Sequence, residues 1–233
     1  MATVDENGLD DLERYLSRAA ILDVAVFPQH GAHRSFRLIL EGGVGVLAKP
    51  ADTIGEGSIV CRREAAAWAL ARGLGWSETV ATTILRTIPS PESGDDVEAS
   101  LQVLWPDVMP DADPGSFPDE DIWKAGTFDA LIGHSDRGGH NWLAVPASGT
   151  TPRLKLVDHG YGFPETVSPP ASTFYEMRRG QPLPDEVLGA LEPLASSEHL
   201  ESVRWLLPPA VVAAVLARAE ALLSRSVLEI SST

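Results

Sequence analysis

Two short polar segments carry the residues whose types and spacing could do chemistry. Residues 133–142 are Gly-His-Ser-Asp-Arg-Gly-Gly-His-Asn-Trp, and residues 154–160 are Leu-Lys-Leu-Val-Asp-His-Gly. They contain two carboxylates and one amide, Asp136, Asp158 and Asn141. In phosphoryl transfer, one carboxylate orients the attacking hydroxyl and accepts its proton, while oxygen ligands hold Mg²⁺. The segments therefore predict a phosphoryl-transfer site with Asp136 as the base and Asn141 and Asp158 as metal ligands.

The order of these residues resembles motifs of the protein-kinase-like superfamily. Asp136 and Asn141 stand five positions apart, as the Asp and Asn of a kinase catalytic loop do. Asp136, Arg137 and Asn141 resemble the Asp-Arg-(x)3-Asn loop of bacterial phosphatidylinositol 3-/4-kinase-like proteins, and residues 158–160 resemble their Asp-x-Gly metal motif. The resemblance implies ATP, Mg²⁺ and transfer of the γ-phosphoryl group to a hydroxyl. Arg137 would contact the γ-phosphate as a catalytic residue or, alternatively, neutralise a carboxylate cluster.

The resemblance extends upstream to residues that would clamp the nucleotide. Residues 44–50 are similar to the strand of the family that carries the nucleotide lysine, here Lys49, which would bind the α/β-phosphates. Residues 63–68 are similar to the Arg-Glu-x-Ala helix, whose Glu pairs with that lysine. Glu64 takes this role in the resemblance. Glu56 competes for it, because the loop after Lys49 is shorter than in the family.

The expected nucleotide site also includes a hinge and a loop over the phosphates. Residues 101–105 resemble the strand that enters the interlobe hinge, so Gln102 and Leu104 are expected to bind the nucleotide. The loop at 29–35 stands where a phosphate-covering loop belongs, but it lacks a Gly-x-Gly-x-x-Gly pattern. Its backbone and Ser35 could meet phosphates, or it could be an ordinary hairpin loop.

The hydrophobic pattern predicts the elements that must position these residues. In the first half we expect a helix at 9–20, strands in hairpin order at 20–26, 35–40 and 44–48, a helix at 59–74, and strands at 79–88 and 99–105. In the second half we expect a helix at 122–132 with Asp119 as N-cap, a strand pair at 142–145 and 154–157, a loop at 164–184, and helices near 185–195, 198–206 and 209–229.

This order of elements predicts an α+β fold. With the motifs, which cover about residues 20–165, it indicates a two-lobed protein-kinase-like fold with a five-stranded antiparallel sheet and one helix in the N-lobe and a mostly helical C-lobe. The expected division is an N-terminal helix and N-lobe at 1–105, a Pro/Asp-rich hinge at 106–118, and a C-lobe with the catalytic and metal loops at 119–233.

Several other residues that could do chemistry have a structural alternative. His134, His140 and His159, with the nearby Asp residues, could form a zinc or di-metal hydrolase centre. Hydrogen bonds that orient the catalytic loop explain His134 and His140 instead, and Asn141 fits a kinase better than a hydrolase. Cys61 lies on an Ala-rich helix and is expected to be a buried small residue rather than a reactive thiol.

Four tryptophans and one pair of arginines also stand out in the sequence. Core or lobe-junction positions are expected for Trp105, Trp123, Trp142 and Trp205. Arg178 and Arg179 form a rare basic pair in the 164–184 loop. They could contact a phosphorylated or acidic substrate, or they could be a solvated loop end.

The charge of the chain limits its partners. The 233 residues include 18 Lys and Arg against 33 Asp and Glu, which gives a formal net charge of −15. Phosphate backbones and anionic membranes attract basic surfaces, so we expect neither a nucleic-acid partner nor stable membrane association. The same argument disfavours a lipid substrate. The N-terminus resembles no targeting peptide and no apolar run reaches about 18 residues, so we expect a cytoplasmic protein. We also expect a monomer or a weak oligomer.

Three functions remain open at this point. The first is a kinase for a hydroxyl-bearing soluble acceptor, which could be a protein, a peptide or a small molecule. The second is a pseudokinase-like nucleotide-binding or scaffold module, which the short loop after Lys49 and the missing glycine pattern allow. The third is transfer of AMP to a protein on the same fold.

Overall fold

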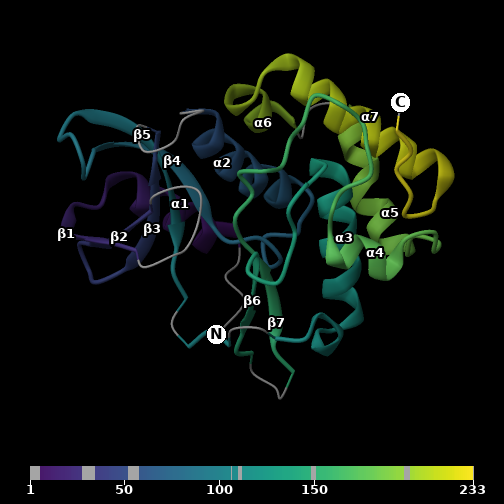
Figure 1. Ribbon diagram of the computed structural model, residues 1–233, viewed down its shortest axis with the longest axis horizontal. Helices are drawn as coiled ribbons and strands as arrows, with labels where there is room; N and C mark the ends of the chain where they lie inside the picture. Colours follow the sequence, from purple (N-terminus) through teal and green to yellow (C-terminus); the bar gives the residue numbers. More distant parts are fainter. Residues whose placement is uncertain are drawn as a thin grey trace.

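An antiparallel five-stranded sheet forms the N-terminal part of the protein in the computed structural model (Figure 1). The structure describes residues 6–27, 35–51, 58–105, 107–109, 112–147, 151–196 and 200–232. The sheet has the order β1-β2-β3-β5-β4 and consists of β1 (Ile21–Val26), β2 (Phe36–Leu40), β3 (Gly45–Pro50), β4 (Thr83–Pro89) and β5 (Asp96–Val103). The predicted hairpin order of the first three strands is confirmed, because β1 pairs with β2 and β2 with β3.

Alternation along the strands gives this sheet a buried face. Phe36, Leu38 and Leu40 of β2 are buried on it, whereas Arg37 between them is exposed. Helix α1 (Glu6–Arg18) packs on this face through Leu16. The turn between β2 and β3 is closed by two glycines with φ of 87° and 84°, the sign that a tight two-residue hairpin turn needs at both positions.

The second half of the chain is mostly helical. It contains α3 (Asp119–Ile132), α4 (Thr173–Arg178), α5 (Asp185–Leu191), α6 (Glu201–Leu206) and α7 (Pro209–Arg225), a two-stranded sheet of β6 (Trp142–Val145) and β7 (Arg153–Leu156), and 3-10 turns at Pro114–Ser116 and Glu192–Ser196. The five-stranded sheet and the helices α3 to α7 lie at opposite ends of the molecule (Figure 1). The predicted α+β class with two lobes is therefore confirmed.

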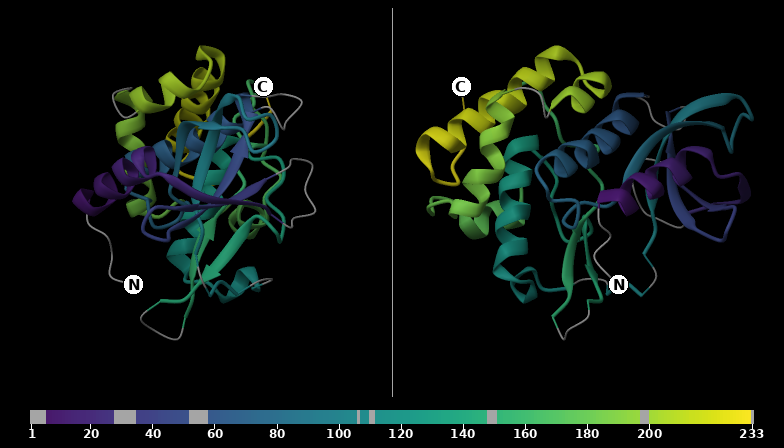
Figure 2. Two further views of the ribbon diagram at one scale, coloured as in Figure 1. Left: turned by 90° about the vertical axis from the view of Figure 1, so that its left-hand side faces the viewer. Right: turned by 180° about the vertical axis from the view of Figure 1, so that it is seen from behind.

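Helix α2 (Ser58–Gly73) lies between the two lobes (Figure 2). It follows β3 in the chain, yet its side chains Trp68 and Leu70 belong to the same buried cluster as Phe128 and Leu131 of α3. The chain after α2 pairs with β7, since Leu156 donates its N–H to the Thr79 carbonyl at 2.7 Å. Because α2 packs against both lobes, residues on it are held firmly relative to the loops around β6 and β7.

Three sequence predictions need correction. The segment at 164–184 contains a short helix, α4, which begins after Ser172, whose hydroxyl accepts the Tyr175 N–H. Asp119 is the first helical residue of α3, and Pro118 before it is the N-cap. Trp205 is 84% exposed on α6 and is not a core residue, whereas Trp123 and Trp142 are buried as predicted. Helix α4 has only six residues, so the helical spacing of its apolar residues cannot be recognised within this Pro-rich segment of the sequence.

None of the helices within the described residues is long and apolar enough to cross a membrane.

Candidate active site

A buried lysine joins the two lobes of the protein. Lys49 near the end of β3 places its Nζ 2.5 Å from Oε1 of Glu64 on α2 and 2.8 Å from Oδ1 of Asp158 after β7. Residues more than one hundred positions apart in the sequence thus meet at one ammonium group. Of the two predicted partners of Lys49, Glu64 forms the ion pair, and Glu56 lies outside the described residues.

The charges of this pair are mutually dependent. Burial by itself favours the neutral amine, but the two neighbouring carboxylates outweigh it and hold the pKa of Lys49 above its ordinary value. Burial likewise opposes ionisation of Glu64, and Lys49 overcomes it, so the pKa of Glu64 lies well below its ordinary value. Lys49 is therefore a cation and Glu64 an anion at neutral pH.

Glu64 also fixes the segment that follows β7. Its Oε2 accepts the backbone N–H of His159 at 2.9 Å, and Arg63 donates to the Gly160 carbonyl at 3.1 Å. A Cβ on Gly160 would lie 2.8 Å from Cγ1 of Val60 on α2, closer than real Cβ contacts, so a larger residue there would require one of the two segments to shift. The helix that carries Glu64 thus holds residues 159 and 160 through two hydrogen bonds and close packing against Gly160.

Asp158 has an unusual backbone conformation. Its φ of 56° lies in the left-handed region, which is costly for a residue with a Cβ, although Asp tolerates it better than most. Its side chain is 35% exposed, beside Lys49. A strained residue that presents a carboxylate to solvent between two lobes is a typical functional position.

The loop after α3 presents Asp136. Helix α3 ends at Gly133, whose φ of 59° closes the helix in the left-handed conformation. Buried His134 then links this loop to residues 158–160, because its Nε2 donates to the Asp158 carbonyl at 2.9 Å and its Nδ1 accepts the Asp136 N–H at 3.1 Å. Burial, together with nearby Arg137, lowers the pKa of His134 to about 4, so the ring is neutral at pH 7. The side chain of Asp136 itself is exposed.

Asn141 lies beside Asp136, as the spacing predicts. Its Nδ2 donates to the Asp136 carbonyl, which closes the loop, and it is itself largely buried. His140 is exposed, and its predicted role in orienting the loop has no hydrogen bond to support it among the described residues. No group of three His, Cys, Asp or Glu residues within the described part of the chain is arranged to hold a metal ion.

The side chain of Arg137 lies in the interior of the protein. Its guanidinium is fully buried, forms an ion pair with Asp129 of α3 at 3.0 Å, and donates to the carbonyls of Asn141 and Val157. Asp129 also accepts the Ser172 hydroxyl at 2.7 Å. The expectation that Arg137 contacts the γ-phosphate is therefore wrong for this geometry, and the alternative, neutralisation of a carboxylate, describes its position. Arg137 is a positioning residue that ties the loop, β7 and α3 together.

The other predicted nucleotide residues lie in or beside the strands of the N-terminal sheet. Gln102 is buried in β5, opposite Leu47 of β3. Leu104 donates its N–H to the Gly45 carbonyl at 3.0 Å, and Ser35 is buried beside the start of β2. Within the described residues, no hydrogen bond or ion pair joins these three to Lys49, Asp136 or Asp158. Most of the 29–35 loop lies outside the described residues, so its predicted role stays a prediction.

Sequence reasoning missed several residues that build the site. Asp129 stands in the apolar run Phe-Asp-Ala-Leu-Ile near the end of α3, and a carboxylate in such a run signals a buried cation nearby. Arg218 stands in the apolar helix α7 and is fully buried. It donates to the carbonyls of Leu131, Pro164 and Thr166, which anchors the chain that follows residues 158–160. Burial lowers the pKa of Arg218 to about 10.

Cys61 contacts the backbone of Lys49, and we predict that its thiol is unreactive. Its fully buried thiol donates to the Lys49 carbonyl at 2.9 Å, and burial raises its pKa to about 11. At pH 8 the thiolate fraction in the native protein is then about 0.1%, so iodoacetamide should label native protein about 100-fold or more slowly than urea-unfolded protein. Labelling is followed by mass spectrometry. Equal labelling rates in the native and the unfolded protein would contradict the burial of Cys61.

The arrangement defines a class of fold. A two-lobed α+β chain with a buried Lys–Glu pair between sheet and helix, and Asp-bearing loops on a helical lobe, has the protein-kinase-like fold. The chain is similar over 97% of its length to the crystal structure of the Golgi casein kinase with Mn/ADP bound, with a TM-score of 0.73, 16% identity and 76% of that chain covered. A second structure of the Golgi casein kinase gives a TM-score of 0.70 and 17% identity, covering 97% of this chain and 75% of that chain.

A bacterial structure shares the fold more distantly. The proinflammatory kinase CtkA of Helicobacter pylori matches 91% of this chain and 96% of its own, with a TM-score of 0.51 and 11% identity. No protein-family model matches this sequence, and no curated protein matches it. At these identities the similarity establishes the fold alone, and the chemistry must be argued from the residues of this chain.

Proposed function

We propose that this protein transfers the γ-phosphoryl group of ATP to a hydroxyl, with Mg²⁺, as a member of the bacterial phosphatidylinositol 3-/4-kinase-like proteins. The observation that carries the proposal is the Lys49 ammonium, held between Glu64 and Asp158 at 2.5 Å and 2.8 Å. A buried cation with a partly exposed carboxylate beside it suits a polyphosphate and its metal. We further propose a cytoplasmic protein with a soluble acceptor, since the net charge of −15 disfavours an anionic membrane.

The donor set fits Mg²⁺ in composition. Asp158 offers a carboxylate that is partly exposed, and Asn141 offers an amide oxygen on the neighbouring loop. Magnesium in nucleotide sites commonly takes one or two protein oxygens and completes its shell with phosphates and water. When bound there, the ion would neutralise charge on the phosphate oxygens. The Mn/ADP in the Golgi casein kinase structure supports a nucleotide and a divalent metal on this fold.

Different residues of the chain have different roles in the proposed phosphoryl transfer. Asp136 orients the acceptor hydroxyl and takes its proton as the hydroxyl oxygen forms a bond to the γ-phosphorus. The bond from the γ-phosphorus to the β–γ bridging oxygen breaks, and ADP leaves with that electron pair. Lys49 binds the α/β-phosphates, and its pairing with Glu64 keeps it charged and in place. His134 and Arg137 hold Asp136 and the segment around Asp158 in register.

Asp136→Asn tests this division of roles. The variant keeps the shape of the side chain but cannot accept a proton, so acceptor phosphorylation should fall about 100-fold. Nucleotide binding should persist, because Lys49 and Asp158 are unchanged. The measurement pairs ADP formation from Mg-ATP with the thermal shift that Mg-ATP produces.

A matched control uses Asp95, which is exposed in the turn between β4 and β5. Asp95→Asn makes the same chemical change far from the cluster and should leave both readouts unaltered. If the wild-type protein binds Mg-ATP but forms neither ADP nor an AMP-modified acceptor, the scaffold alternative is correct. If AMP appears on a protein acceptor in mass spectra, the AMP-transfer alternative is correct.

A further inference from the structure

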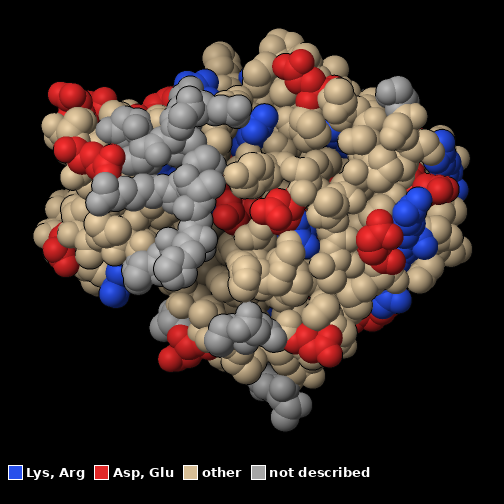
Figure 3. Space-filling model, viewed as in Figure 1, with Lys and Arg blue, Asp and Glu red and all other residues tan. Residues whose placement is uncertain are grey.

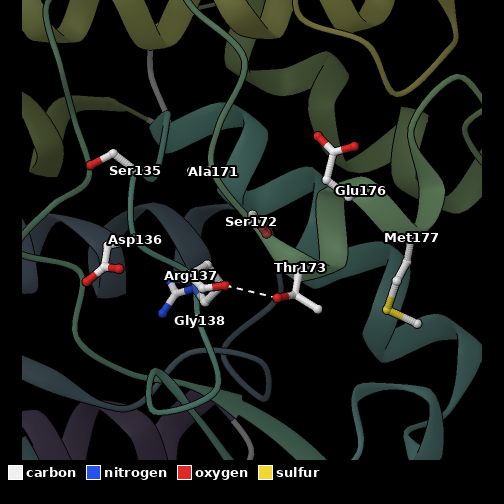
Figure 4. Close-up of a pocket in the computed structure, with 9 residues that line it drawn as sticks. All are labelled: Ser135, Asp136, Arg137, Gly138, Ala171, Ser172, Thr173, Glu176 and Met177. Atoms are coloured by element: carbon white, nitrogen blue, oxygen red, sulfur yellow. Dashed lines mark hydrogen bonds between the residues drawn. The ribbon is translucent and has the colours of Figure 1, made fainter.

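A pocket of about 690 Å³ opens beside Asp136 on the helical lobe (Figure 4). One side comes from the catalytic loop, with Ser135, Asp136 and Gly138. The opposite side comes from α4 and the residues before it, with Thr173, Glu176 and Met177. The pocket is shallow and largely open to solvent, so it suits a small molecule or a few residues of a peptide that stay partly exposed. Because Asp136 lies at one end, a hydroxyl bound in this pocket can meet the proposed base.

The walls of the pocket are preformed. Arg137 donates its N–H to the Ala171 carbonyl at 2.9 Å, and Ala171 donates its own to the His134 carbonyl at 2.9 Å. The Thr173 hydroxyl donates to the Arg137 carbonyl at 3.2 Å (Figure 4). Beneath these contacts the buried ion pair of Arg137 and Asp129 holds Ser172. The catalytic loop and the start of α4 therefore form one rigid unit around the pocket.

The charges that face this pocket are carboxylates. Asp136 and Glu176 are both exposed and lie at opposite ends of the lining (Figure 4). Arg137 is buried in its ion pair and offers no charge to a ligand. Arg178 pairs with Asp119 and lies over the Trp123 ring at 5.3 Å, away from the pocket. Arg178 is therefore not placed to make the predicted contact of this basic pair with an acidic substrate.

The second member of the basic pair competes with a ligand only weakly. Arg179 lies 3.6 Å from Glu176, and both side chains are about half exposed. Exposed pairs of this kind contribute little and exchange readily with another cation. Acidic side chains also lie near the middle of this face, where the two lobes meet, in the space-filling view (Figure 3). The charged side chains exposed in the lining are therefore Asp136 and Glu176, with Arg179 beside Glu176.

We propose that this pocket binds the acceptor of the transfer and selects one with a cationic nitrogen near its hydroxyl. The inference rests on the proposed function, and it names the substrate class. Glu176 binds the cationic nitrogen, Met177 and Ala171 contact the apolar stem, and Asp136 meets the hydroxyl. A Ser or Thr next to Lys or Arg has this chemistry, and so does an amino sugar. The residue roles predict that an acidic acceptor is disfavoured.

The test compares acceptors that differ only in charge. Three peptides carry one serine flanked by Lys, by Ala or by Glu, and a second arm compares an amino sugar with its neutral parent sugar. Transfer from Mg-ATP is measured as kcat/KM for each acceptor with the wild-type protein, Glu176→Lys and Glu220→Lys. Glu220 is exposed on α7, so its variant changes the net charge equally without touching the pocket.

The expected result is a ratio rather than a rate, so partial unfolding of a variant does not mimic it. The wild-type protein and Glu220→Lys should prefer the Lys-flanked peptide over the Glu-flanked one by about fivefold at low salt. Glu176→Lys should invert the preference, and added salt should weaken it. An increase in rate for the amino sugar but for no peptide identifies a small-molecule acceptor and supports the same proposal.

Three outcomes would overturn the proposal about the acceptor. The first is an unchanged ratio in Glu176→Lys, and the second is a wild-type preference for the Glu-flanked peptide. The third is transfer to none of these acceptors while Mg-ATP still shifts the melting temperature and ADP still forms, which leaves the proposed function standing. A wild-type protein that neither binds Mg-ATP nor forms ADP contradicts the proposed function itself, and the acceptor proposal fails with it.

Discussion

Asp158→Asn is expected to reduce phosphoryl transfer by about 1,000-fold or more, the largest effect on activity that the site predicts. The amide has nearly the same shape, but it carries no charge to hold a divalent cation on the phosphates. The Lys49 ammonium also loses one of its two carboxylate partners, which lie at 2.5 Å and 2.8 Å. The measurement is ADP formation together with the thermal shift by ATP, each with and without Mg²⁺.

The dependence on the metal is what distinguishes this role from a structural one. In the wild-type protein Mg²⁺ should strengthen the thermal shift that ATP produces, and in Asp158→Asn this increment should vanish. The protein should still fold, because the Lys49–Glu64 pair and the His159 N–H contact to Glu64 do not involve the Asp158 carboxylate. Asp95→Asn serves again as the control with the same chemical change. Full turnover in Asp158→Asn would remove Asp158 from the proposed site.

The sequence predicts those parts of the fold that depend on local patterns. The strands β1 to β3 follow from alternation and from the Gly42-Gly43 turn, whose positive φ values suit glycine. Spacing alone brings Asp136 and Asn141 into one loop, since their hydrogen bond closes a segment of six residues. The α+β class follows from the same short-range signals.

Contacts between distant residues decide the rest. The sequence favours Glu64 as the partner of Lys49 through the resemblance but leaves Glu56 as a competitor, and the position of α2 between the lobes brings Glu64 to Lys49. Arg137 is next to Asp136 in the chain, and its burial depends on Asp129, a full helical turn and a loop away. Trp205 is exposed because α6 turns it to solvent, which composition does not reveal.

The ion pair between Arg137 and Asp129 is expected to give the largest effect on stability. Both side chains are fully buried, with 0% exposure, so removing either partner leaves an uncompensated charge in the interior. Arg137→Met and Asp129→Asn should each lower the free energy of unfolding by about 3–5 kcal/mol. In a chain of this size that corresponds to a fall in melting temperature of about 10 °C, measured by calorimetry or urea unfolding.

The double variant separates the charge from the contacts around it. Asp129→Leu combined with Arg137→Met leaves neither charge in the interior, so it should be more stable than Arg137→Met alone. It still loses the hydrogen bonds from Arg137 to the carbonyls of Asn141 and Val157, so the positions of Asn141 and Asp158 should loosen and transfer should stay low. Arg14→Met, which breaks an exposed pair with Asp11, should change stability by less than about 0.5 kcal/mol. If the double variant recovers both stability and transfer, Arg137 only neutralises Asp129. Recovered stability with low transfer would show that Arg137 fixes the geometry on which the proposed chemistry depends.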